Sequence, residues 1–233
     1  MIKNYETWDY PFFEAPRRIP RAERGRLFDA FVAGKAERAR YFATRFPAIA
    51  DALAALSAPD GDAVAAMHRI ERWWRKDIAT IRVREGGLAA LFGKLGLGGS
   101  HEDIVGRDDA AGLRAMRKAP NAAATVVLSI IGDLSIILGD ALILRRPDFL
   151  WAIDDDAEDA RLKMPAAGRV VVMKPRQGEL VPICLDFYDG LTNAYDIPAR
   201  DDFRTVEVQG IWNSNFAGWW VVNTANGWAD AIA

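Results

Sequence analysis

A long apolar run that contains two aspartates constrains the fold of this chain more than any other feature. Residues 122–144 include twelve leucines, isoleucines and valines. They also contain two similar steps, Ile-Ile-Gly-Asp ending at Asp133 and Ile-Leu-Gly-Asp ending at Asp140. An unpaired carboxylate among apolar side chains is costly. The run therefore indicates a membrane span, a catalytic pair of carboxylates, or a buried helix whose aspartates have internal partners.

The composition of the run argues against a membrane span. A span needs about 20 apolar residues, which the run supplies. On an insertion scale its twelve aliphatic residues contribute about −4 to −7 kcal/mol, and its two aspartates cost about +5 to +7 kcal/mol. The two contributions cancel, so we expect no membrane span. The N-terminus also lacks the basic region and apolar stretch of a secretory signal, which favours a cytoplasmic protein.

A buried helix explains the run better. Pro120 and Asn121 are typical of a helix start, and Gly139 is typical of a helix end. Asp133 and Asp140 then lie on one face, because seven residues make almost two turns. Small residues accompany them on this face and allow another backbone to approach closely: Thr125, Ser129, Gly132 and Ser135. The alternative is a β-meander with a tight turn at each Gly-Asp step, in which the two carboxylates face opposite sides.

The spacing of the two aspartates limits the chemistry that they can share. Two carboxylates on one face can act as general acid and base or as metal ligands. Two helical turns, however, separate their Cα atoms by about 10.5 Å. We therefore expect that Asp133 binds an arginine or tryptophan of the N-terminal helices and that Asp140 ends the helix. The alternative is a hydrolase that uses Asp133, Asp140 and His101 beneath the glycine-rich loop of residues 86–99. We expect no cofactor and no metal site, because no corresponding motif is present.

Apolar residues at helical spacing dominate the first half of the chain. The first twenty residues are rich in proline and aromatic rings and predict an extended arm on the core. Helices follow, with breaks at Gly34 and Pro47, and a third helix is expected at residues 48–56. Asp60 or Asp62 can cap a fourth helix, on which we expect His68 at the surface. The apolar face of this fourth helix is predicted to consist of Val64, Met67, Ile70, Trp74 and Ile78.

The second half of the chain contains segments typical of strands. Those with the expected length and composition are residues 141–144, 149–153, 169–173, 205–211 and 218–223. A further segment, residues 181–188, fits a strand or a helix. We predict an α+β fold with a helical N-terminal half packed on a small, mostly antiparallel C-terminal sheet. Residues 1–118 and 119–233 are expected to form two regions of one integrated domain.

The two regions carry opposite net charge. Residues 1–118 hold 21 lysines and arginines against 16 acidic residues, a net charge of +5, and residues 119–233 hold 9 against 16, a net charge of −7. The basic segment 17–26 could bind nucleic acid, but a net charge of +5 is low for such a surface, so we expect the two regions to attract each other. The single Cys184 excludes an internal disulfide and a cysteine-rich zinc module.

The densest group of like charges is the acidic segment, which we define as residues 154–159. It lacks the alternating ligands and the glycine of a calcium loop, so it is either a solvated loop or a surface for a basic protein partner. Two tryptophan pairs, Trp73-Trp74 and Trp219-Trp220, are expected to pack in the core. The alternative is that they line a ligand groove, because adjacent rings on an amphipathic helix place one in the core and one near the rim. The candidate binding residues are Asp154, Asp155, Asp156, Glu158, Asp159, Trp219 and Trp220.

One resemblance to known proteins rests on the apolar run and the strand after it. The sequence GDL at 132–134, ILGD at 137–140 and Trp151 on a strand resembles a pattern in uncharacterised bacterial proteins, including some immunity proteins of polymorphic toxin systems. The family pattern commonly has an aromatic residue near Ile137 and a glutamate at Asp140. Such proteins bind and neutralise a cognate toxin and are not enzymes. The resemblance therefore implies a bacterial binding protein, with the hydrolase as the alternative.

Overall fold

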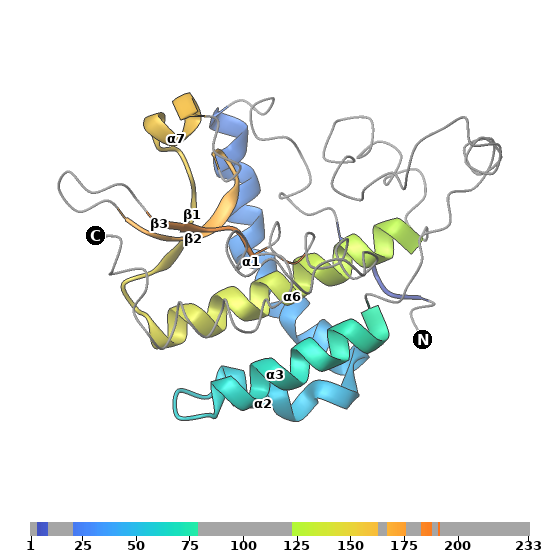
Figure 1. Ribbon diagram of the computed structural model, residues 1–233. Helices are drawn as coiled ribbons and strands as arrows, with labels where there is room; N and C mark the ends of the chain where they lie inside the picture. Colours follow the sequence, from blue (N-terminus) through green and yellow to red (C-terminus); the bar gives the residue numbers. More distant parts are fainter. Residues whose placement is uncertain are drawn as a thin grey trace, which may run out of the picture.

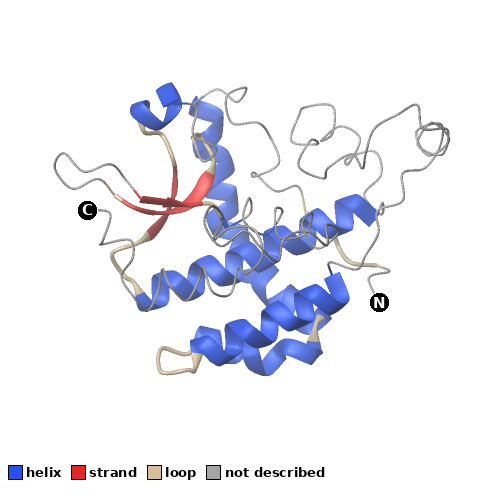
Figure 2. Cartoon of the chain, in the orientation of Figure 1, coloured by secondary structure: helices blue, strands red, loops and turns tan. Residues whose placement is uncertain are grey.

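The computed structural model describes residues 4–8, 21–78, 123–162, 167–175, 183–187 and 191, and these form an α+β fold (Figures 1 and 2). In chain order the elements are α1 (Arg21–Arg45), the 3₁₀ turn η2 (Pro47–Ile49), α2 (Ala50–Ser57), α3 (Ala63–Trp73), the π-helical turn η3 (Trp74–Ile78), α6 (Ala123–Arg145), β1 (Leu150–Ile153), α7 (Ala157–Leu162), β2 (Val170–Lys174) and β3 (Ile183–Leu185). In Figure 1, α1 crosses behind α6, from the sheet at one end to the α2–α3 pair at the other. The predicted fold class is confirmed.

Helix α1 is continuous, so the predicted break at Gly34 is wrong. A single glycine costs only about 1 kcal/mol in a helix interior, and here it has a packing role. A Cβ at Gly34 would lie 3.0 Å from the ring of Trp8. The arm residues 4–8 therefore pack on α1, as expected, while Phe31 and Phe42 of α1 are fully buried in the core.

The turn between α2 and α3 depends on one side chain and on one position that has none. Asp62 caps α3 by accepting a hydrogen bond from the backbone N–H of Ala65 at 3.0 Å, which confirms one of the two predicted caps. Gly61 lies so close to α2 that a Cβ there would come 2.0 Å from the carbonyl oxygen of Ala55. Helix α2 itself begins two residues later than predicted, because Pro47 starts a 3₁₀ turn before it.

Arg145 at the end of α6 joins this helix to the end of α2. Its guanidinium donates hydrogen bonds to the backbone carbonyl oxygens of Ala55, Leu56 and Ala58. The last carbonyls of a helix have no partner within it, so Arg145 caps α2 from a neighbouring helix. Burial lowers the pKa of the Arg145 guanidinium.

The residues that α3 and the following turn bury differ in part from those predicted. Val64 was expected in the core but is 45% exposed. Trp73 and Trp74 are both buried, at 7% and 1% exposed, so core packing of this pair is confirmed and its division between core and rim is wrong. The reason is that Trp73 packs edge-on against the rings of Phe42 and Phe46. The remaining predicted core residues of this segment are buried: Met67, Ile70 and Ile78.

Helix α6 runs without a break through the whole apolar run. The predicted stop at Gly139, the strand at residues 141–144 and the β-meander alternative are therefore wrong. Among the described glycines only Gly168 has a positive φ, so Gly139 keeps a conformation that continues the helix. A Cβ at Gly139 would lie 2.2 Å from the ring of Trp151. This glycine permits close packing against the sheet rather than ending the helix.

The same helix meets the length and composition of a membrane span. The segment Val126–Arg145 has a mean hydropathy of 2.1, and 89% of its most apolar window is buried inside the protein. Central helices of protein cores are also long and apolar. The absence of a membrane span and the cytoplasmic location stay predictions.

The described sheet has three antiparallel strands in the order β1-β2-β3. In its register Trp151 lies opposite Val172, and Met173 lies opposite Cys184. The strands predicted at residues 149–153 and 169–173 are confirmed as β1 and β2, and the ambiguous segment 181–188 contains β3. The strands predicted at residues 205–211 and 218–223 lie outside the described residues.

One hydrophobic core draws on both regions of the chain. Its buried members include Phe42 and Ile70 from residues 1–118 and Leu134 and Val172 from residues 119–233. Helix α6 lies inside this core, which explains why it is apolar on all sides. The polar groups that α6 carries must therefore find partners within the protein.

Candidate functional site

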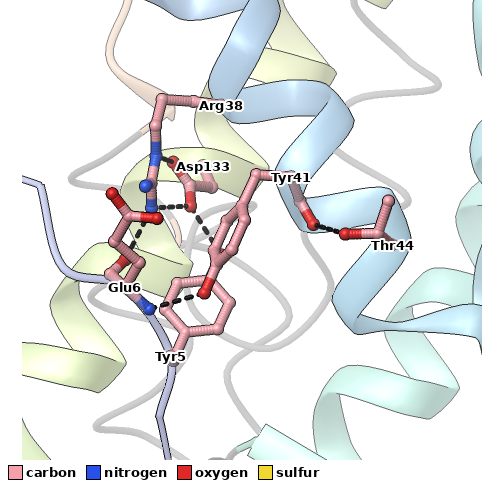
Figure 3. A network of polar contacts seen from close by, with 6 residues as sticks. All are labelled: Tyr5, Glu6, Arg38, Tyr41, Thr44 and Asp133. Atoms are coloured by element: carbon pink, nitrogen blue, oxygen red, sulfur yellow. Dashed lines mark hydrogen bonds and ion pairs between the residues drawn. The ribbon is translucent and has the colours of Figure 1, made fainter.

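Asp133 is the centre of a buried polar network between α6 and α1 (Figure 3). Its side chain is 0% exposed. Arg38 of α1 donates its Nε to one carboxylate oxygen at 2.9 Å and its Nη2 to the other at 2.6 Å, and the Tyr5 hydroxyl donates to the second oxygen at 2.5 Å. A bidentate arginine and a hydroxyl together offset the cost of burying a carboxylate. The prediction that Asp133 binds an arginine of the N-terminal helices is confirmed.

Aromatic rings and backbone groups surround the arginine of this network. The Arg38 guanidinium carbon lies 4.7 Å from the centre of the Tyr41 ring, 5.9 Å from that of Tyr5 and 5.8 Å from that of Trp8. Arg38 also donates to the carbonyl oxygen of Glu6 at 2.8 Å, and the Tyr41 hydroxyl accepts from the Glu6 N–H. Residues 4–8 are thus fixed to α1 by Arg38 and Tyr41 and to α6 by the bond from Tyr5 to Asp133 (Figure 3).

The Tyr5 hydroxyl is a much weaker acid in this network than a tyrosine in water. Burial raises the pKa of the Tyr5 hydroxyl far above its ordinary value, and the negative charge of Asp133 and the hydrogen bond to it raise it further. The positive charge of Arg38 lowers the pKa of Tyr5, but by less than burial and Asp133 together raise it. Tyr5 is therefore a permanent hydrogen-bond donor to Asp133 and is unsuited to act as a base.

Asp140 lies two turns along α6 and also bonds to α1, but nearer the surface. Lys35 donates to both carboxylate oxygens, at 2.6 and 2.7 Å, and Trp151 of β1 donates its indole N–H at 2.7 Å. The side chains of Lys35 and Asp140 are 24% and 37% exposed. The prediction that Asp140 ends the helix is wrong, because it lies within α6 and connects three elements.

The described part of the chain gives the two aspartates separate structural partners. They bond to different side chains of α1, and they are seven positions apart on the helix, so a shared substrate or ion between them is unfavourable. His101 and the loop of residues 86–99, which the hydrolase alternative also needs, lie outside the described residues. Among the described residues no group of three or more His, Cys, Asp or Glu could hold a metal ion.

The acidic segment begins with a residue that the structure removes from the surface. Asp154 was predicted to face a partner, but it is 1% exposed. Its backbone N–H donates to the carbonyl of Arg169, its carbonyl accepts from Gly168, and its carboxylate accepts from the N–H of Asp156. Gly168 has a φ of 79°, which favours glycine. Asp154 therefore holds the backbone of the acidic segment against the residues before β2.

The next residues of the acidic segment reach the surface. Asp155 is exposed and Asp156 is half-buried. Arg24 of α1 forms an ion pair with Asp155 at 3.1 Å, so part of the opposite charge of the two regions is matched inside the fold, as expected. Glu158 and Asp159 belong to α7, but their side chains are not among the described ones, and Trp219 and Trp220 lie outside the described residues.

The sequence analysis missed a basic surface on α3 and the turn that follows it. We define the basic face as His68, Arg69, Arg72, Arg75 and Lys76, all of which are exposed. The prediction that His68 lies at the surface is confirmed. The signal that could have revealed this surface is the spacing of the cations by three and four residues on one helix.

Comparison with known proteins assigns no relative to this arrangement. No family model matches the chain, and neither a curated protein nor a solved structure matches it.

Proposed function

We propose that this chain is a bacterial binding protein that captures a protein with a basic surface through the acidic segment, in the manner of a toxin-neutralising immunity protein. The observation that carries the proposal is the construction of the segment. Asp154 is buried, and its backbone bonds to Gly168 and Arg169, which precede β2. Asp155 and Asp156 follow it and reach the surface. Carboxylates are thereby presented on a fixed backbone.

A fixed acidic surface suits rapid recognition of a basic protein. A segment that is ordered before binding loses less conformational entropy when its partner arrives. Opposite charges across an interface accelerate the encounter and discriminate against acidic competitors. Arg24 holds Asp155 through an ion pair of which both side chains are partly exposed, so a basic partner can replace Arg24 at small energetic cost.

The aspartates of α6 also favour binding over hydrolysis. Asp133 is bonded to Arg38 and Tyr5, and Asp140 to Lys35 and Trp151. A general acid or base needs a carboxylate that can approach a substrate. Asp133 is fully buried and cannot do so, and Asp140, although partly exposed, is bonded within the interface between α1 and α6.

The proposal is tested by affinity capture of the tagged protein from a lysate of its native host, followed by identification of what is retained. We expect one protein in stoichiometric amount, with a basic surface. The substitutions Asp155→Asn and Asp156→Asn together should weaken its retention by about tenfold or more, because charge pairs steer and hold such complexes. Retention should also weaken as salt is raised.

A matched control separates the acidic segment from net charge. Glu37 on α1 and Asp60 in the α2–α3 turn are exposed, so Glu37→Gln with Asp60→Asn changes the net charge equally. This control should keep the partner. Elution of the wild-type protein alone, or equal retention by both double variants, would contradict the proposal.

A further inference from the structure

The basic face of α3 is a second charged surface that the acidic segment does not explain. Three of its cations follow one another along the helix at Arg69, Arg72 and Lys76, and all three are exposed. Spacings of three and four residues bring neighbouring Cβ atoms to about 5–6 Å on one helix face. Arg69 and Arg72 lie on α3, and Lys76 extends the row into the π-helical turn η3 that follows it.

The carboxylates of the same segment neutralise little of the charge at Arg69 and Arg72. Glu71 is buried and accepts from Arg75, whose side chain is still 53% exposed. Neither Arg69 nor Arg72 pairs with a carboxylate within the part of the chain that the structure describes. Basic residues near a helix end interact favourably with the helix dipole, but that interaction does not need four of them on one side.

We propose that the basic face of α3 binds an acidic helical segment of a protein. A partner helix with glutamates three and four residues apart repeats the spacing of the arginines, so several pairs can form at once. Arginine supports such pairing because its planar guanidinium meets a carboxylate through two parallel hydrogen bonds.

The composition of the surface favours a protein over nucleic acid. The whole chain has a net charge of −2, so a long polyanion would be repelled outside the basic face. The tryptophans of this segment, Trp73 and Trp74, are buried and offer no ring on which a base could stack. Val64 lies at the start of α3 and is 45% exposed. An apolar contact of this kind suits a side chain of a protein partner.

The inference goes beyond the proposed function and does not depend on it. The acidic segment would take a basic partner, and the basic face would take an acidic one. Variants of Asp155 and Asp156 leave the basic face intact, so the two proposals can fail separately.

The test uses a fluorescently labelled synthetic peptide as the probe. It is longer than about 15 residues so that it forms a helix in water, and it carries glutamates at spacings of three and four and one leucine at the end of this row. A second peptide has glutamine in place of every glutamate, and a short DNA duplex of equal charge is the third probe. Fluorescence anisotropy with the full chain gives the affinity for each probe at low and at physiological salt.

We expect the full chain to bind the glutamate peptide, and Arg69→Glu with Arg72→Glu to weaken this binding about tenfold or more, which is about 1.4 kcal/mol or more. The control is Arg26→Glu with Arg40→Glu, two exposed arginines of α1 that give the same change in net charge. It should leave the affinity within about twofold of wild type. If the variant Arg69→Glu with Arg72→Glu does not fold, Arg69→Gln with Arg72→Gln replaces it. The control is then Arg26→Gln with Arg40→Gln.

Three results would overturn the inference. They are no binding of the glutamate peptide at low salt, equal or tighter binding of the DNA duplex or the glutamine peptide, and an equal loss of affinity in the α1 control. The second result would assign the basic face to phosphates or to apolar contact, and the third would assign the effect to net charge.

Discussion

The two ends of the α1–α6 interface carry ion pairs of the same type at different depths. At one end Asp133 and Arg38 have side chains that are 0% and 9% exposed. At the other end Asp140 and Lys35 are 37% and 24% exposed. Both aspartates end a similar four-residue motif with glycine before the aspartate. The motif itself therefore does not determine how much each ion pair contributes to stability.

Depth determines what happens when one partner is removed. Loss of the acid from a buried pair leaves a cation that water cannot reach, whereas water replaces a lost partner near the surface. Residues 4–8 create the difference, since Tyr5 bonds to Asp133 and Trp8 packs over Arg38. The arm therefore makes one end of the interface essential to stability.

The largest expected effect comes from Asp133→Asn, which keeps the size of the side chain but removes its charge. Arg38 would remain buried without a counter-charge, and the free energy of unfolding should fall by about 3–5 kcal/mol. Asp140→Asn is the matched control near the surface and should cost about 0.2–1 kcal/mol. Urea unfolding followed by circular dichroism measures both. Similar losses of unfolding free energy in the two variants would contradict the view that the deeper ion pair contributes more to stability.

A smaller effect, with a distinct pH dependence, is expected for Tyr5→Phe. Removal of a hydrogen bond to a charged group should lower the free energy of unfolding by about 1.5–3 kcal/mol at neutral pH. The raised pKa of Tyr5 means that the folded protein keeps this proton above pH 10.0, where an unfolded tyrosine loses it. The contribution of Tyr5 is therefore complete below pH 10.0 and is lost as the pH rises above it, by up to about 1.4 kcal/mol per pH unit.

Unfolding measured from neutral pH to above pH 10 checks this dependence. The wild-type protein should lose stability more steeply in alkali than Tyr5→Phe does. Tyr41→Phe keeps Tyr5 and its bond to Asp133, and it should retain the steepness of the wild type. If the free energy of unfolding falls equally steeply with pH in the wild type and in Tyr5→Phe, the Tyr5 hydroxyl does not bond to Asp133.

The sequence was sufficient to predict those features that depend on local patterns and on burial. The apolar run could be assigned to a buried helix because two carboxylates oppose insertion into a membrane. An arginine or tryptophan partner for Asp133 followed from the need to compensate its buried charge, and the partner is Arg38. The cap at Asp62 and the strands β1 and β2 followed from residue type and spacing. These predictions need no knowledge of distant contacts.

The predictions that failed concern residues whose role is set by distant neighbours. Gly34 and Gly139 were interpreted as breaks, but Trp8 and Trp151 pack against them and use the space that a glycine leaves. Asp154 was placed at the surface, because its bonds to the residues before β2 could not be foreseen. In each case local preference and tertiary packing give opposite answers, and packing determines the structure.

The smallest of the expected effects tests the end of the interface near Asp140 through packing rather than charge. Gly139→Ala would place a Cβ 2.2 Å from the ring of Trp151 and 2.9 Å from Val172. Either the ring moves and strains its hydrogen bond to Asp140, or α6 and the sheet separate, so the free energy of unfolding should fall by about 1–3 kcal/mol. Gly25→Ala in α1 is the control, because nothing lies within 4 Å of its Cβ position. It should stabilise the protein by about 0.5–1 kcal/mol through higher helix propensity. If both alanines stabilise the protein, Gly139 is not a packing residue, and the sheet is held to α6 more loosely than the contact between Trp151 and Gly139 requires.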